Sequence, residues 1–194
     1  MSNINDTNLF KHVNDTYFIG HVITMLLAFG LFMPCAILAS IYRGTSNTWY
    51  YAHVSFNIIG LILSMIGFIL GIVLAGDGRF EQIHPILGLT SMSLVLLQPM
   101  NAAIRPYYIS DDGKKYTRIV WEWYHKISGR IILIISSLTI GFGIEYAYQL
   151  HYYNETTYLL FTLLYSIYST MVGMAMVLPQ LYRFCHSSIR RINL

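Results

Sequence analysis

Long apolar runs separated by polar linkers make up most of the chain. A helix needs roughly 20 mainly apolar residues to cross the hydrocarbon core of a bilayer. Three of the linkers are short, which favours antiparallel neighbouring helices, and the link at 105–122 is longer and the most polar. The pattern predicts an all-α integral membrane protein with five transmembrane helices, over residues 18–42, 51–75, 84–104, 123–147 and 156–180.

Prolines refine these boundaries. Pro85 lies near the start of the third run and Pro179 near the end of the fifth, so both fit helix ends. Pro34 lies inside the first run, where its missing N–H and its ring disturb the helix. We therefore expect the first helix to bend at Pro34.

The composition agrees with a membrane protein. Hydrophobic residues make up 55% of the chain and charged residues 11%, whereas soluble domains carry about 25% charged residues. Lipid is therefore the expected solvent for most of the chain. The net charge of +3 is small and scattered, which argues against nucleic acid as a partner.

Basic residues and glycosylation triplets predict the orientation. Ten of the twelve lysines and arginines fall on one side of the predicted bilayer, which the positive-inside bias makes the cytosol. The polar tail 1–17 then lies outside, residues 148–182 form an outer loop and the fifth helix, and the basic tail 183–194 is cytosolic. N-x-T triplets at Asn5, Asn14 and Asn154 all fall outside, which fits a plasma membrane or an endomembrane.

Four of the seven histidines lie at the ends of predicted spans, one on each of the first four. An ionisable side chain in a membrane helix indicates a functional site by default. Because successive helices alternate in direction, His21 and His84 should lie together at the outer end. His53 and His125 should lie together at the inner end.

Two imidazoles at one depth suit a haem better than a zinc ion. A zinc site needs four ligands, and neither layer offers the additional Cys, Asp or Glu. A haem brings four equatorial nitrogens, so two axial histidines suffice. Gly88 and Gly129, each four residues after a histidine, leave room on the same helix faces. Two haems ligated in this way would pass electrons rather than bind oxygen.

Four segments of the sequence resemble a known family. The segments "HVITMLLAFGLFMPCAILASIYR", "WYYAHVSFNIIG", "HPILGLTSMSLVLLQPMNAAIRP" and "WEWYHKISGRIILI" are similar to the cytochrome b-561 domain, in the branch that includes ferric-chelate-reductase-like proteins and often accompanies an extracellular DOMON domain. The resemblance implies an antiparallel four-helix haem-binding core at 18–147 and a peripheral fifth helix. It also implies two haems b, the outer one between His21 and His84 and the inner one between His53 and His125.

The resemblance further implies an ascorbate-dependent transmembrane oxidoreductase of the ferric reductase type. Cytosolic ascorbate would be the donor, and a ferric chelate or monodehydroascorbate the outer acceptor. Candidate residues for binding the anionic donor are basic and lie on the predicted cytosolic side: Arg43, Arg105, Lys115 and Lys126. These residues could instead serve only to set the topology. Many relatives have six spans rather than five, and no DOMON domain precedes this core, so a partner or small molecule would replace it.

Two alternatives remain open from the sequence. The chain could be a haem-bearing electron carrier or sensor subunit of a larger complex, or a haem-free transporter whose histidines relay protons. The expected partners are the lipid bilayer, the small-molecule donor and acceptor and, in a homodimer, a second copy of the chain. The oligomeric state itself stays open.

Overall fold

The computed structural model describes residues 3–76, 81–106 and 112–192, and every regular element within these ranges is helical. The elements are α1 (Asn3–Leu27), a π-helical turn (Ala28–Phe32), α2 (Met33–Ile41), α3 (Thr48–Ala75), α4 (Ile83–Ala103), α5 (Asp112–Gln149) and α6 (Glu155–Ile192). Five stretches are long and apolar enough to cross a membrane: Asn14–Ile41, Thr48–Ala75, Ile83–Ala103, Tyr116–Gln149 and Glu155–Arg183. The predicted all-α class with five transmembrane helices is confirmed.

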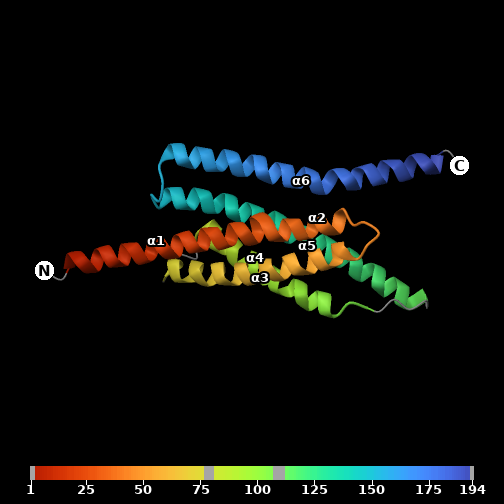
Figure 1. Ribbon diagram of the computed structural model, residues 1–194, viewed down its shortest axis with the longest axis horizontal. Helices are drawn as coiled ribbons and strands as arrows, with labels where there is room; N and C mark the ends of the chain where they lie inside the picture. Colours follow the sequence, from red (N-terminus) through yellow and green to blue (C-terminus); the bar gives the residue numbers. More distant parts are fainter. Residues whose placement is uncertain (1–2, 77–80, 107–111, 193–194) are drawn as a thin grey trace.

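Helices α1 to α5, with the π-helical turn between α1 and α2, form one bundle, and α6 lies along one side of it (Figure 1). α1 and α2 pack along α3, while α4 packs along α5. α6 contacts α5 and α2 and buries little of its own surface. An apolar cluster of Ala28, Phe29, Met33, Met92, Val95 and Ile132 forms the centre. Each transmembrane stretch that carries these residues has a single span histidine, and the residues follow it by 7 to 12 positions along the chain.

Several helices extend beyond the predicted spans. α5 begins at Asp112, inside the segment that the sequence predicts to be a polar link. Salt bridges one turn apart stabilise this extension, from Arg118 to Glu122 at 3.1 Å and from Lys126 to Glu122 at 3.2 Å. α1 likewise begins at Asn3, within the predicted polar tail. Hydropathy detects contact with lipid, so it cannot find a helix that continues into water.

A π-helical turn interrupts the first helix immediately before α2, which carries Pro34 in its first turn, and the bend expected at Pro34 stays a prediction. A proline ring crowds the carbonyl four residues earlier and offers it no N–H. That carbonyl belongs to Gly30, and it accepts a hydrogen bond from the hydroxyl of Tyr168 on α6. A neighbouring helix thus satisfies the group that the proline leaves free.

Pro179 produces the reciprocal contact. The prediction that it ends the fifth helix is wrong, because α6 continues to Ile192 with Pro179 in its interior. The carbonyl four residues before Pro179 belongs to Ala175, and it accepts a hydrogen bond of 3.0 Å from the Tyr42 hydroxyl. Tyr42 directly follows α2. The first helix and α6 therefore each donate a tyrosine hydroxyl to the backbone group that the other's proline leaves free.

We expect Tyr168→Phe to lower the free energy of unfolding by about 0.6 kcal/mol, the average for a side-chain hydrogen bond between membrane helices. The substitution removes the hydroxyl that donates to the Gly30 carbonyl from α6. Unfolding in mixed detergent measures the change. The control is Tyr182→Phe, because Tyr182 lies on the same helix and is 70% exposed. Equal stability of the two variants would contradict the assignment.

Candidate haem-binding sites

The outer histidine pair joins α1 to the first turn of α4. The rings of His21 and His84 lie with centroids 6.1 Å apart and planes at 90°. Nδ1 of His21 donates to the Gly67 carbonyl oxygen at 2.7 Å, and Nδ1 of His84 donates to that of Thr139 at 2.9 Å. Because a carbonyl only accepts, each Nδ1 carries the proton and each Nε2 keeps a free lone pair.

The inner pair joins α3 to α5. The rings of His53 and His125 have centroids 6.3 Å apart and planes at 73°. Nδ1 of His53 donates to the Ala36 carbonyl oxygen at 2.8 Å, as in the outer pair. His125 differs, because its Nδ1 lies 3.5 Å from the side-chain Nδ2 of Asn101. The Trp121 indole stacks on the His125 ring at 5.2 Å and 7°.

Both spacings suit two imidazoles on opposite sides of one metal. With metal–nitrogen bonds of about 2.0 Å and a ring radius of about 1.1 Å, such rings have centroids roughly 6 Å apart. No group of three or more His, Cys, Asp or Glu residues that could hold a metal ion occurs in the described part of the chain. The two pairs therefore fit a metal whose other ligands come from a cofactor, as in a haem.

Two glycines on neighbouring helices make room for the outer histidines. A Cβ atom at Gly71 of α3 would lie 2.9 Å from the His21 ring, and one at Gly143 of α5 would lie 2.9 Å from the His84 ring. Sequence reasoning missed both, because it searched only along each histidine's own helix and selected Gly88 and Gly129. A search of the sequence for glycines at the same depth on adjacent helices could have found Gly71 and Gly143.

The outer pair opens into a cavity of about 620 Å³, within the range of about 300–1,000 Å³ for small-molecule and cofactor sites. Gly88 lines it, and its walls are mainly apolar. Ser136 also lines it, and the Ser136 hydroxyl is buried without a hydrogen-bond partner in the structure. α6 contributes Tyr165 and Tyr168, so the fifth helix is peripheral in the bundle but forms part of this wall.

Aromatic rings surround the outer end of the cavity. Tyr146 stacks on His84 at 6.0 Å and 28°, and Phe18 stacks on Tyr152 at 3.8 Å and 7°. Tyr153, in the loop between α5 and α6, donates its hydroxyl to the Ile144 carbonyl. Desolvation, with a smaller contribution from Tyr158, raises the pKa of Tyr153 to about 12. This hydroxyl therefore stays protonated at neutral pH and remains a donor.

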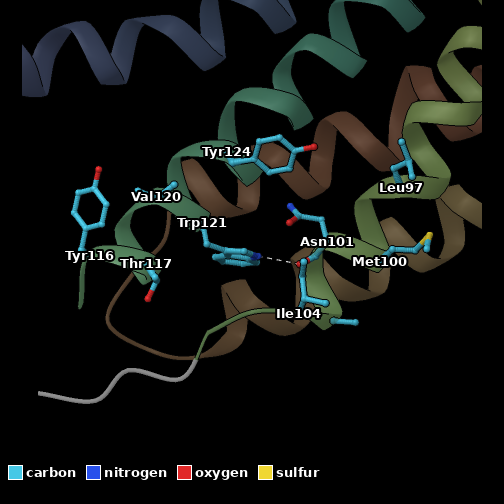
Figure 2. Close-up of a pocket in the computed structure, with 10 residues that line it drawn as sticks. Leu97, Met100, Asn101, Ile104, Tyr116, Thr117, Val120, Trp121 and Tyr124 are labelled. Carbon is cyan, nitrogen blue, oxygen red and sulfur yellow. Dashed lines mark hydrogen bonds between the residues drawn. The ribbon is translucent and has the colours of Figure 1, made fainter. Parts of the chain in front are cut away.

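At the inner end, a groove lies between the end of α4 and the start of α5 (Figure 2). Asn101 and Trp121 face each other there, and the indole N–H donates to the Asn101 backbone carbonyl at 2.9 Å. The guanidinium carbons of Arg105 and Arg118 lie 5.8 and 5.3 Å from the Trp121 ring centroid. Arg118 also donates to the Pro106 carbonyl at 2.8 Å.

The four basic residues predicted to bind a donor lie in different surroundings. Arg105 is exposed beside Trp121. Arg43 lies in the link between α2 and α3, 5.9 Å from the Trp49 ring centroid, and Lys126 pairs with Glu122. The side chain of Lys115 lies outside the described residues. Arg118, which the sequence analysis did not select, contacts the same indole as Arg105.

Two further amides border the histidines. Asn57 donates to the His53 backbone carbonyl at 2.7 Å, and its Nδ2 lies 3.4 Å from Nε2 of His53. Gln98 donates to the Ser128 hydroxyl at 2.7 Å, while its own Oε1 is buried without a partner in the structure. Asn57 therefore lies on the metal-facing side of His53, and Gln98 retains an unused acceptor near α5.

Comparisons with known proteins identify the region that carries these sites. The family described as eukaryotic cytochrome b561 matches residues 20–151. Two "cytochrome b561 and DOMON domain-containing" proteins of Arabidopsis thaliana are 33% and 30% identical over 114 and 129 residues, which is 58% and 66% of this chain. The chain spans 30% and 31% of those relatives' own lengths.

A relative from Danio rerio, "Putative ferric-chelate reductase 1", is 33% identical over 96 residues, 50% of this chain and 16% of that protein. The family match covers more than half of the 194 residues and includes all four span histidines. The chain therefore belongs to the eukaryotic cytochrome b561 family, a family of membrane proteins that bind haem b and transport electrons.

Proposed function

We propose that the chain binds two haems b and passes electrons through them from one side of the membrane to the other. One haem would lie between His21 and His84, and the other between His53 and His125. The observation that carries the proposal is the centroid spacing of 6.1 and 6.3 Å within the two pairs. When bound, each haem supplies an iron centre that accepts and releases one electron at a time.

The chain's own residues would orient and separate the two cofactors. Backbone carbonyls hold Nδ1 of His21, His84 and His53, which directs each Nε2 towards a metal and raises the basicity of the ligand. The buried hydroxyl of Ser136 is available to a polar group in the outer cavity, and Oε1 of Gln98 to one near the inner pair. The apolar central cluster excludes water between the two sites.

We infer that the N-terminus is extracytoplasmic and the C-terminus cytosolic, following the positive-inside bias. On this assignment, residues 18–147 form the haem core, flanked by the outer tail 1–17, the outer loop and fifth helix 148–182, and the cytosolic tail 183–194. The His53–His125 pair then faces the cytosol. Electrons would enter there and leave beside the His21–His84 pair.

We infer that the donor is cytosolic ascorbate, an anion that loses one electron and one proton. Positive charge at the inner face favours its approach, because Arg105 and Arg118 flank Trp121 there. The sequence assigns Arg43, Lys115 and Lys126 to the same side of the membrane. A ferric chelate or monodehydroascorbate would take the electron outside. The name of the Danio rerio relative supports a ferric acceptor.

A second candidate function is an electron-carrying or sensing subunit of a larger complex. The observation that favours it is that both Arabidopsis relatives are named for a cytochrome b561 region together with a DOMON domain, so the region is joined to another domain in those proteins. A subunit of this kind would hold the same haems, but ascorbate alone would reduce those haems only slowly.

Sealed vesicles separate the two functions. With ascorbate trapped inside and a ferric chelate outside, we expect vesicles that contain the wild-type protein to reduce the chelate at least tenfold faster than empty vesicles. The His53→Ala variant should fall to the rate of empty vesicles, because the inner site is then incomplete. Protein that contains haem but reduces no chelate would favour the subunit, and protein without haem would refute both.

A further inference from the structure

His125 is held differently from the other three span histidines. His21, His53 and His84 each donate Nδ1–H to a backbone carbonyl on a neighbouring helix, at 2.7, 2.8 and 2.9 Å. Nδ1 of His125 instead lies 3.5 Å from the side-chain amide nitrogen of Asn101. A backbone carbonyl is fixed by its helix, whereas a side-chain amide can rotate and can be replaced by mutation.

The chemistry of a metal-bound imidazole defines what this amide must do. When Nε2 binds a metal, Nδ1 carries a proton and needs an acceptor. An amide nitrogen cannot accept, but a half-turn of the Asn101 amide exchanges Nδ2 and Oδ1 in the same place. The oxygen would then occupy the position that a backbone carbonyl occupies beside each of the other three histidines.

Trp121 fixes both members of this contact. Its ring stacks on His125 at 5.2 Å and 7°, and its N–H donates to the Asn101 backbone carbonyl at 2.9 Å. Arg118 in turn lies over the indole and is held by the Pro106 carbonyl and by Glu122. Figure 2 shows Trp121 and Asn101 facing each other across the groove between α5 and α4.

We propose that Asn101 and Trp121 are positioning residues for His125 and that they set the reduction potential of the inner haem independently of the outer one. The proposal rests on the proposed function, because it needs a haem at the inner pair. A stronger acceptor at Nδ1 makes the imidazole a better donor to iron and favours the oxidised state. A weaker acceptor favours the reduced state. The outer ligands, held by Gly67 and Thr139, are unaffected.

The test is a redox titration of the purified haem-loaded protein with substitutions at Asn101. Asn101→Asp keeps the shape of the side chain and supplies a charged acceptor. We expect it to shift the reduction equilibrium of one haem at least tenfold towards the oxidised state, which is about 59 mV for a one-electron couple. Asn101→Leu removes the acceptor and should shift the same haem in the opposite direction. The second haem in each molecule is the internal control.

Trp121 has a separate readout that mere folding would not change. The electron paramagnetic resonance signal of a ferric bis-imidazole haem depends on the angle between the two ring planes, 73° in the inner pair. Trp121→Leu removes the stack and should broaden or move the signal of one haem only. Trp121→Phe keeps a stacking ring and should restore most of the wild-type signal.

The outcomes distinguish this inference from the function on which it rests. Wild-type protein without haem would overturn the proposed function and this inference together. If the wild-type protein holds two haems, unchanged potentials in both Asn101 variants would overturn the role of Asn101, and an unchanged signal in Trp121→Leu would overturn that of Trp121. Equal shifts of both haems would overturn it as well, because the contact concerns one pair.

Discussion

Replacing His21 by alanine should remove the same haem as replacing His84, and should leave one haem per chain. The two rings face each other at 6.1 Å and 90°, so loss of either leaves one axial position empty. Changing only the groups around a metal ligand costs about 10–100-fold in metal affinity, so loss of a ligand should cost more than about 100-fold. Haem content per chain and the reduced-minus-oxidised spectrum measure the result.

The inner pair provides the complementary half of this experiment. His53→Ala and His125→Ala should both remove the other haem, because their rings are paired at 6.3 Å. His186→Ala is the control, since His186 is exposed on α6. A spectrum in which His21→Ala and His53→Ala lose the same haem would refute the pairing. Loss of no haem in any of the four variants would refute histidine ligation altogether.

The membrane itself explains why the sequence predicts so much of this fold. Lipid requires each span to satisfy its own backbone groups over a fixed thickness, so apolar length alone locates five helices. Alternation of direction then places His21 with His84 and His53 with His125. The structure brings together these same pairs, although the argument used no information on helix contacts.

Features that depend on contact between helices could not be predicted in this way. The tyrosine hydroxyls that meet the carbonyls freed by Pro34 and Pro179 come from positions more than 130 residues away in the chain. The stacking of Trp121 on His125 joins residues four apart, and it was within reach of helical spacing. The sequence analysis assigned that tryptophan to the polar link, because hydropathy does not detect the start of α5 at Asp112.

Gly143→Ala should weaken retention of the outer haem without changing any ligand. The added methyl group would lie 2.9 Å from the His84 ring, so either the ring or α5 must move. Such overpacking costs about 1–3 kcal/mol, or roughly five- to 150-fold in haem affinity if the whole cost falls on binding. We expect Gly71→Ala to act in the same way through His21, also at 2.9 Å.

Gly141→Ala is the matched control, because a methyl group there meets nothing within 4 Å and lies on the same helix two residues away. Both substitutions gain the same helix propensity, about 0.8–1.0 kcal/mol, so their difference isolates the contact with His84. Haem loss to apomyoglobin, followed spectroscopically, measures retention of each haem. Equal rates for Gly143→Ala and Gly141→Ala would mean that His84 does not depend on close approach of α5. Faster loss of the outer haem from Gly143→Ala than from Gly141→Ala would support the prediction that Gly143 leaves room for the His84 ring.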